Sequence, residues 1–245
     1  YEIASTLQLN SDFFNNNGNF SIKTQSINTL GNAEIHGSIR GNSDSFYVNI
    51  APSNIFFNHK KWELQSPNTI IISPGFLYLN NVTLQSGRQM LTLNRDQAIP
   101  NSIAIGLHNV ETNPINNMMG ITEFFINGNI NGSVYCTDIF EQPRIAYDLN
   151  IDTLYIDDIR FGHLEASGNA DLTKSTFSLS PRTTLHSDIG AVQFDIQGNY
   201  SRRHPELKGR IIIDEAPMEW IQPFTKDYIH NIGGSFSAKI LLDGS

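Results

Sequence analysis

Short stretches in which apolar and polar residues alternate strictly run along this chain, and they constrain its fold more than any other feature. Residues 145–152 carry isoleucine, tyrosine, leucine and isoleucine at every second position, and residues 192–197 carry valine, phenylalanine and isoleucine in the same way. Residues 7–9, 103–107 and 236–240 repeat the pattern. Because successive side chains of a β-strand point to opposite faces, each stretch predicts a strand with one apolar and one polar face.

Glycine and asparagine are spaced between these stretches at short intervals. Both residues accept a positive φ at low cost, which tight β-connections need. We therefore predict turns at Asn15–Asn19, at Asn127–Asn129 and at the Gly-Asn pairs 31–32, 41–42, 168–169 and 198–199. Many short strands joined by regular turns indicate an all-β fold, which the pattern leaves open between a sandwich, a barrel, a solenoid and a related open sheet.

One segment, residues 217–229, lacks the alternation. Trp220, Ile221, Phe224 and Ile229 approximate one face of a helix, and Pro223 suits the first turn of a helix. We predict one short helix near 217–229, ended before Gly233 and Gly234.

The predicted domain organisation follows from a second irregular stretch. Residues 109–120 contain Pro114, an asparagine pair and two methionines, and they mark the best internal boundary. We expect a first β block over 1–110, a connecting loop over 111–123, and a second block over 124–245. The stretches 127–134 and 232–239 resemble each other at a separation of about 105 residues, which suggests a long unit of many strands used twice.

Composition excludes several classes of function. The net charge is −8 with a pI near 5.3, so the chain lacks the basic footprint of a nucleic-acid-binding protein. Its single cysteine, Cys136, permits no internal disulfide, and we expect it to act as a small apolar residue.

No catalytic or metal-binding motif stands out. The seven histidines show no pair at i, i+2 or i, i+4, and the acidic group of Asp152, Asp157 and Asp158 lacks the spacing of a calcium loop. The sequence contains no Gly-x-Ser-x-Gly elbow and no phosphate-binding glycine loop. We therefore expect neither an enzyme nor a cofactor or metal site.

Two regions resemble the TamB family of AsmA-like proteins of the Gram-negative envelope. The first is 124–179, with Phe125 to Val134, the Gln142–Ile145 turn, and the strands at 149–158 and 162–172. The second is 207–244, where the strand 207–214 is followed by Pro217, Trp220 and a strand that starts at Gly233–Gly234. Residues 62–94 are similar to Bacteroidetes-type members. We expect the chain to be a segment of a longer secreted bacterial protein.

The resemblance implies a fold and a role. Members of that family form a long β-sheet curled into an open apolar groove, called a β-taco. They are anchored in the inner membrane and span the periplasm. They are implicated in moving glycerophospholipids between the membranes and, with a TamA-like outer-membrane barrel, in assembling outer-membrane β-barrel proteins. The implied partners are thus phospholipid acyl chains, the TamA-like barrel and unfolded outer-membrane protein strands.

Under that resemblance the apolar strand faces are the working surface. The residues expected to line the lipid groove are Ile130, Val134, Leu149, Ile151, Phe194, Ile196, Ile211, Ile213, Phe236 and Ile240. The alternative is that these side chains fill the closed core of a sandwich. Two other functions compete with lipid transport: a surface adhesin or carbohydrate-binding module, which should show exposed aromatic platforms, and a β-helix enzyme acting on polysaccharides.

Overall fold

The computed structural model describes residues 6–25, 31–57, 60–65, 67–96, 99, 101–112, 125–172, 176–186, 190–201, 206–225, 228–229 and 232–244. Nearly all of this part of the chain is β-strand, and hydrogen bonds join its strands into an antiparallel sheet that is not closed into a barrel. The predicted all-β fold and open sheet are confirmed. The chain divides into two compact units, residues 1–108 with 136–141 and residues 109–135 with 142–245.

The first unit is built of short strands. These are β1 (Thr6–Phe14), β2 (Asn17–Gln25), β3 (Gly31–Gly41), β4 (Phe46–Ile50), β5 (Ser53–Phe57), β6 (Lys60–Leu64), β7 (Thr69–Ser73), β8 (Phe76–Asn80), β9 (Val82–Ser86), β10 (Gln89–Asn94) and most of β11 (Ile103–Glu111). The predicted strands at 7–9 and 103–107 are confirmed as parts of β1 and β11. The predicted turn at Asn15 and Asn16 joins β1 to β2, and both residues have positive φ.

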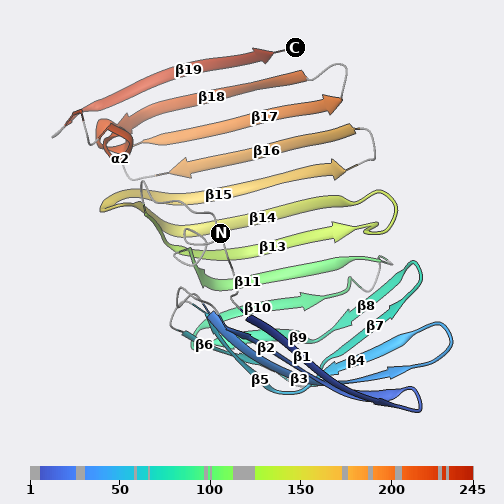
Figure 1. Cartoon of the computed structure of the whole chain (residues 1–245). Coiled ribbons are helices and arrows are strands. Elements are labelled where there is room, and N and C mark those ends of the chain that lie inside the picture. The colour runs from blue at the N-terminus through green and yellow to red at the C-terminus, as the bar shows by residue number, and fades with distance from the viewer. Residues whose placement is uncertain are drawn as a thin grey trace. The chain divides into compact units, whose positions relative to one another are not determined.

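The second unit has longer strands that follow one another as antiparallel neighbours from β14 to β19 (Figure 1). Its strands are β12 (Ile126–Asn127), most of β13 (Asn129–Thr137), β14 (Arg144–Ile156), β15 (Ile159–Leu172), β16 (Thr176–His186), β17 (Ala191–Ser201), β18 (Glu206–Pro217) and β19 (Ser235–Gly244). The predicted strands at 145–152, 192–197 and 236–240 lie in β14, β17 and β19.

The predicted short helix is also present. It consists of a 3₁₀ turn, η1 (Met218–Ile221), followed by one α-helical turn, α2 (Gln222–Thr225), with Pro223 in that turn. It ends well before Gly233, so the two glycines do not terminate it. The predicted connecting loop at 111–123 lies mostly outside the described residues.

Three predicted turns were wrong. Gly31–Asn32, Gly168–Asn169 and Gly198–Asn199 lie within β3, β15 and β17. At Gly168 the reason is steric: a Cβ there would lie 2.7 Å from the Tyr147 hydroxyl on the neighbouring strand. Glycine makes room at this position for a large side chain, so no reversal of the chain is involved.

Candidate functional site: an apolar sheet face

The register of the second unit places apolar side chains on one face of six consecutive strands. Residues opposite each other in an antiparallel pair point to the same face, so a row of partners can be followed across the sheet. One row is Ile151, Leu164, Leu185, Val192, Ile213 and Ala238, and the next is Leu149, Ala166, Thr183, Phe194, Ile211 and Ile240. Thr183 is the single polar member of these two rows.

The first unit carries the same arrangement. Leu9, Ile22 and Ile35 are partners across β1, β2 and β3. Further along the chain, another row crosses four strands and consists of Leu64, Leu84, Leu91 and Leu107. Each unit therefore has a face made of aliphatic and aromatic side chains.

The opposite face of the second unit is polar and charged. Asp195 on β17 lies between two arginines that are its register partners: its carboxylate is 3.9 Å from the Arg182 guanidinium and 3.3 Å from that of Arg210. His163 lies 3.3 Å from Glu165 on the same face. Exposed ion pairs of this kind contribute little stability, so this face is mainly a solvated surface.

One end of the apolar face in the second unit is covered. Trp220 of η1 stacks on Phe161 with ring centroids 5.3 Å apart, and its indole N–H donates a hydrogen bond to the Arg160 carbonyl oxygen at 3.1 Å. Beneath this cap lies a buried cluster consisting of Ile151, Leu154, Phe161, Leu185, Val192, Ala216 and Trp220. We call this set the capped cluster.

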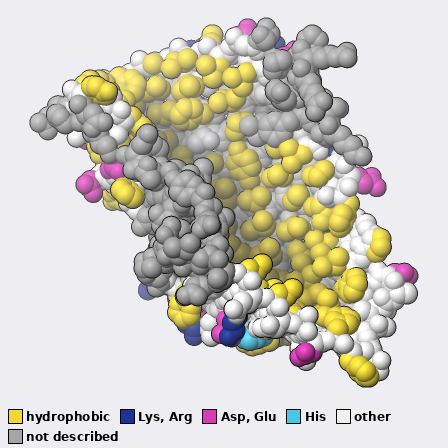
Figure 2. Space-filling view, viewed as in Figure 1, with side chains coloured by type: hydrophobic (Ala, Val, Ile, Leu, Met, Phe, Trp, Pro, Cys, Tyr) yellow, Lys and Arg dark blue, Asp and Glu magenta, His cyan; other side chains and the backbone are white. Residues whose placement is uncertain are grey.

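Further along the same face, apolar side chains are open to solvent. Leu207 is 47% exposed and Ile240 is 44% exposed, and both lie on the apolar face by register. Figure 2 shows hydrophobic side chains gathered side by side over the strands of this unit, with charged side chains at the margins. Within the described residues, the helical elements that accompany the sheet are η1 and α2.

Nine of the ten predicted groove residues lie on this face, in its capped or its open part. Ile151 belongs to the capped cluster, and five others pack against it: Ile130, Phe194, Ile211, Ile213 and Phe236. Leu149, Ile196 and Ile240 lie on the same face outside that cluster. Val134 is half-buried on β13.

The predicted groove residues leave out several residues that the structure brings to the same place, although Val192 was already predicted on the apolar face of its strand. Leu164, Leu185 and Val192 alternate with polar neighbours, and that signal was sufficient to find them. Phe161 had no such signal, because alternation from Leu164 would place it on the polar face. Gly162, with φ of 103°, changes the parity of β15 and lets both Phe161 and Leu164 pack into the apolar face.

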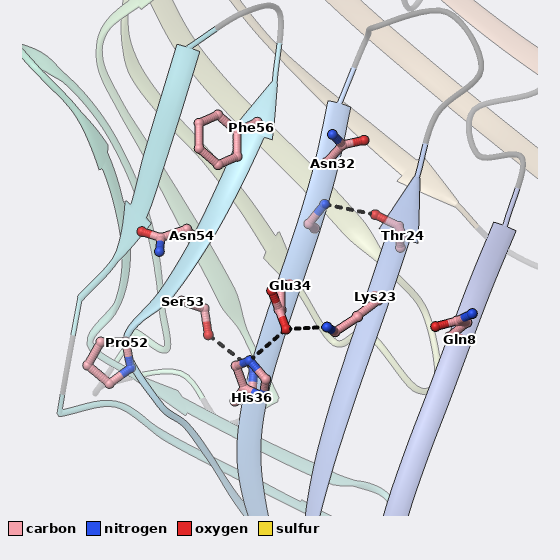
Figure 3. Close-up of a pocket in the computed structure, with 11 residues that line it drawn as sticks. Gln8, Lys23, Thr24, Asn32, Glu34, His36, Pro52, Ser53, Asn54 and Phe56 are labelled. Carbon is pink, nitrogen blue, oxygen red and sulfur yellow. Dashed lines mark hydrogen bonds and ion pairs between the residues drawn. The ribbon is translucent and has the colours of Figure 1, made fainter.

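The first unit contains a serine, a histidine and a glutamate close together, in the pocket shown in Figure 3. The Ser53 hydroxyl accepts a hydrogen bond from the backbone N–H of His36 and donates one to the Ala51 carbonyl oxygen. The His36 ring instead lies 3.4 Å from Glu34. The hydroxyl is thus used by the main chain and is not paired with the imidazole as an activated nucleophile requires.

Two further searches of the described part of the chain gave negative results. No group of three or more histidine, cysteine, aspartate or glutamate side chains there is arranged to hold a metal ion. Among the same residues, no helix has the length and apolar character needed to cross a membrane. Cys136 is half-buried, and burial raises the pKa of its thiol.

Comparison with known proteins found no matching family model, no matching curated protein and no matching solved structure.

Proposed function

We propose that this chain is a groove segment of a TamB-like protein, in which the apolar sheet face shelters the acyl chains of glycerophospholipids. The observation that carries the proposal is the register of β14 to β19, which aligns apolar partners on one face of six consecutive strands. A lipid in transit needs apolar cover for each CH₂ group, at about 0.8 kcal/mol per group. Partners aligned strand after strand provide such cover along the sheet.

The amphipathic character of the sheet supports the same proposal. A closed sandwich buries the apolar faces of its sheets, whereas Leu207 and Ile240 are both more than two-fifths exposed. An exposed apolar patch on a protein surface commonly marks an interaction site. On this proposal the face works without a catalytic residue, since binding by burial needs only shape and apolar surface.

The resemblance in sequence adds the cellular setting to the proposal. The parent protein would be anchored in the inner membrane and this segment would lie in the periplasm, with a TamA-like barrel as a partner. Assistance to outer-membrane β-barrel assembly is part of the same proposal, because a strand edge can pair with an unfolded strand by β-augmentation.

Lipid capture by the purified chain tests the proposal. The chain is mixed with a phospholipid extract, repurified, and analysed by native mass spectrometry followed by lipid extraction. We expect bound phospholipid on the unmodified chain. A double variant, Leu207→Lys with Ile240→Lys, places two charges on the exposed part of the apolar face and should lose the lipid, since a buried charge without a partner is strongly unfavourable.

β19 offers a matched control. Leu241 is adjacent to Ile240, is 71% exposed, and lies on the opposite face of the same strand. Leu241→Lys therefore makes the same chemical change away from the apolar face and should retain lipid. Equal lipid binding by the double variant and this control, with circular dichroism showing that all three proteins are folded, would overturn the proposal. So would a folded, unmodified chain that takes up no phospholipid.

A further inference from the structure

A notch interrupts the polar face of the first unit where β3 changes partners. Gly31–Glu34 of β3 pair with β5, whereas Gly37–Gly41 pair with β4. The turn between β4 and β5 contacts β3 at the point where β3 changes partners. There the Ala51 N–H donates a hydrogen bond to the His36 carbonyl oxygen at 2.8 Å. Ser53, only 4% exposed, fixes this point by accepting a hydrogen bond from the His36 N–H. The resulting pocket is thus built into the sheet by main-chain hydrogen bonds.

A balanced set of charges lies on one side of the pocket. Glu34 is 2.6 Å from the Lys23 ammonium and 3.4 Å from the His36 ring (Figure 3). The hydrogen bond from Lys23 lowers the pKa of the Glu34 carboxyl, so Glu34 is ionised at neutral pH. The set offers donors from Lys23 and acceptors from Glu34 with little net charge.

An exposed aromatic ring and several amides line the rest of the pocket. Phe56 is 47% exposed although it lies on the polar face, where its register partners are Asn32 and Lys61. Asn32, Asn54 and Gln8 also line this pocket (Figure 3). Each of these amides can donate and accept hydrogen bonds at once.

We infer that this pocket is a binding site for a neutral pyranose unit of an oligosaccharide. A pyranose presents a face of C–H groups and an edge of vicinal hydroxyls. The face of a phenyl ring is electronegative and attracts polarised C–H groups, so the Phe56 ring can pack against the C–H face of the sugar. The neighbouring amide and carboxylate groups can bind the hydroxyl edge of the sugar, because each hydroxyl both donates and accepts a hydrogen bond.

The charges favour a neutral sugar over the alternatives. A polyanionic glycan would meet Glu34 in the pocket and a chain of net charge −8 around it. A lipid tail would find a lining made mainly of amides, hydroxyls and charged groups. The site lies on the polar face of the first unit, whereas the proposed lipid-binding role belongs to the apolar face. The sugar-binding inference and the lipid-binding proposal can therefore be tested, and can fail, independently.

Titration of the ¹⁵N-labelled chain with short glycans, followed by NMR, tests the inference. The probes are cellohexaose and chitohexaose as neutral glycans and hexagalacturonate as the anionic control. We expect the neutral probes to shift the side-chain amide signals of Asn32 and Asn54 and the backbone signals of β3 and β5. Phe56→Ala should weaken binding by about tenfold or more, through loss of the aromatic contact.

Phe14→Ala is the matched control, because Phe14 is 78% exposed in the same unit but lies outside this pocket. It should bind the neutral glycans as the unmodified chain does. Asn54→Ala, tested beside Asn49→Ala on β4, separates pocket amides from other surface amides in the same way. Absence of shifts with both neutral glycans, equal binding by Phe56→Ala and Phe14→Ala, or equal binding of hexagalacturonate would each overturn the inference.

Discussion

Several glycines lie in the middle of strands with an aromatic ring from the neighbouring strand over them. The Tyr147 ring lies over Gly168, and the Phe20 ring lies over Gly37. A side chain at either glycine would collide with that ring, so each pair acts as one packing unit on the sheet. Aromatic cover of a strand glycine restores apolar contact that the glycine itself cannot provide.

Gly132 on β13 is the most constrained of the glycines. Its φ is 128°, and an added Cβ would collide with the Asp148 carbonyl oxygen on β14. We expect Gly132→Ala to lower the free energy of unfolding by about 2 kcal/mol or more, since it combines backbone strain with a clash against main chain. Urea denaturation in a Trp62→Phe background, followed by Trp220 fluorescence, measures this.

Gly233→Ala is the control for that variant, because a Cβ there would meet no atom within 4 Å and its φ is not in the left-handed region. It should unfold at the midpoint of the unmodified chain. Equal midpoints for the two alanine variants would contradict the constraint assigned to Gly132.

Tyr147 gives the second unit a dependence on high pH. Burial raises the pKa of Tyr147 above its ordinary value of about 10. Below that value the phenol is neutral in both states. As the pH rises further, the unfolded chain loses its proton first, so stability is lost between the unfolded and the folded pKa.

We expect the urea midpoint to fall from about pH 9 to about pH 11, and Tyr147→Phe to fall less over this range, because it removes the titrating group. Tyr155→Phe, on β14 of the same unit, serves as the control and should follow the unmodified chain. A Tyr147→Phe profile that coincides with the control would show that Tyr147 is not the group responsible.

At the scale of elements, irregularities in the long strands decide which side chains reach the capped cluster. β18 and β19 shift register between Ile213 and Ala216, where Glu215 has φ of 47° and its N–H donates to the Ser237 hydroxyl. This bulge lets Ile213 and the fully buried Ala216 both contact the cluster. A bulge commonly redirects side chains in this way, and here it leads the chain into η1.

The cap that η1 forms over the apolar face can be tested by changing Trp220. Trp220→Ala removes the stack on Phe161 and leaves a cavity over the capped cluster, which should cost about 3–5 kcal/mol of unfolding free energy. Trp220→Phe keeps much of the apolar contact but loses the hydrogen bond to Arg160, and should cost less. Denaturation monitored by circular dichroism compares them, and a Trp220→Ala variant within about 1 kcal/mol of the unmodified chain would contradict the role of η1 as a cap.

At the scale of the whole molecule, consecutive strands from β14 to β19 are hydrogen-bonded to one another in the order in which they follow in the chain. Strands of an extended sheet contact mainly their sequence neighbours, as repeats of a solenoid do. Stability in such architectures is a sum of local terms, and full cooperativity is not required.

We therefore expect the two units to unfold in separate transitions. Each unit contains one of the two tryptophans, with Trp62 buried in the first and Trp220 in the second. In the Trp220→Phe variant the remaining Trp62 fluorescence follows the unfolding of the first unit. In the Trp62→Phe variant the remaining Trp220 fluorescence follows the second unit. The second unit should unfold at the higher urea concentration, because the capped cluster lies there. Coincident transitions in both variants and in circular dichroism would indicate a single cooperative unit.

The sequence by itself determined the strands and their two faces. Alternation at residues 145–152 and 192–197 is a local property, because the period of two follows from the covalent geometry of an extended chain. It therefore predicted β14 and β17, and the helical pattern around Trp220 predicted η1 and α2. The same reasoning placed Leu149 and Phe194 on the apolar faces of their own strands, whereas the run Ile211–Ile213 left open which residues share the apolar face.

Only the tertiary structure decided what depends on residues far apart in the chain. Gly168 was mistaken for a turn because its partner, Tyr147, is set by strand register. Phe161 reaches the capped cluster because Gly162 changes parity, and the notch beside His36 exists because β3 changes partners. Register, parity and partner choice are non-local, since they minimise the energy of whole strand pairs. They decide which part of an alternating face is buried as core and which part stays open to a ligand.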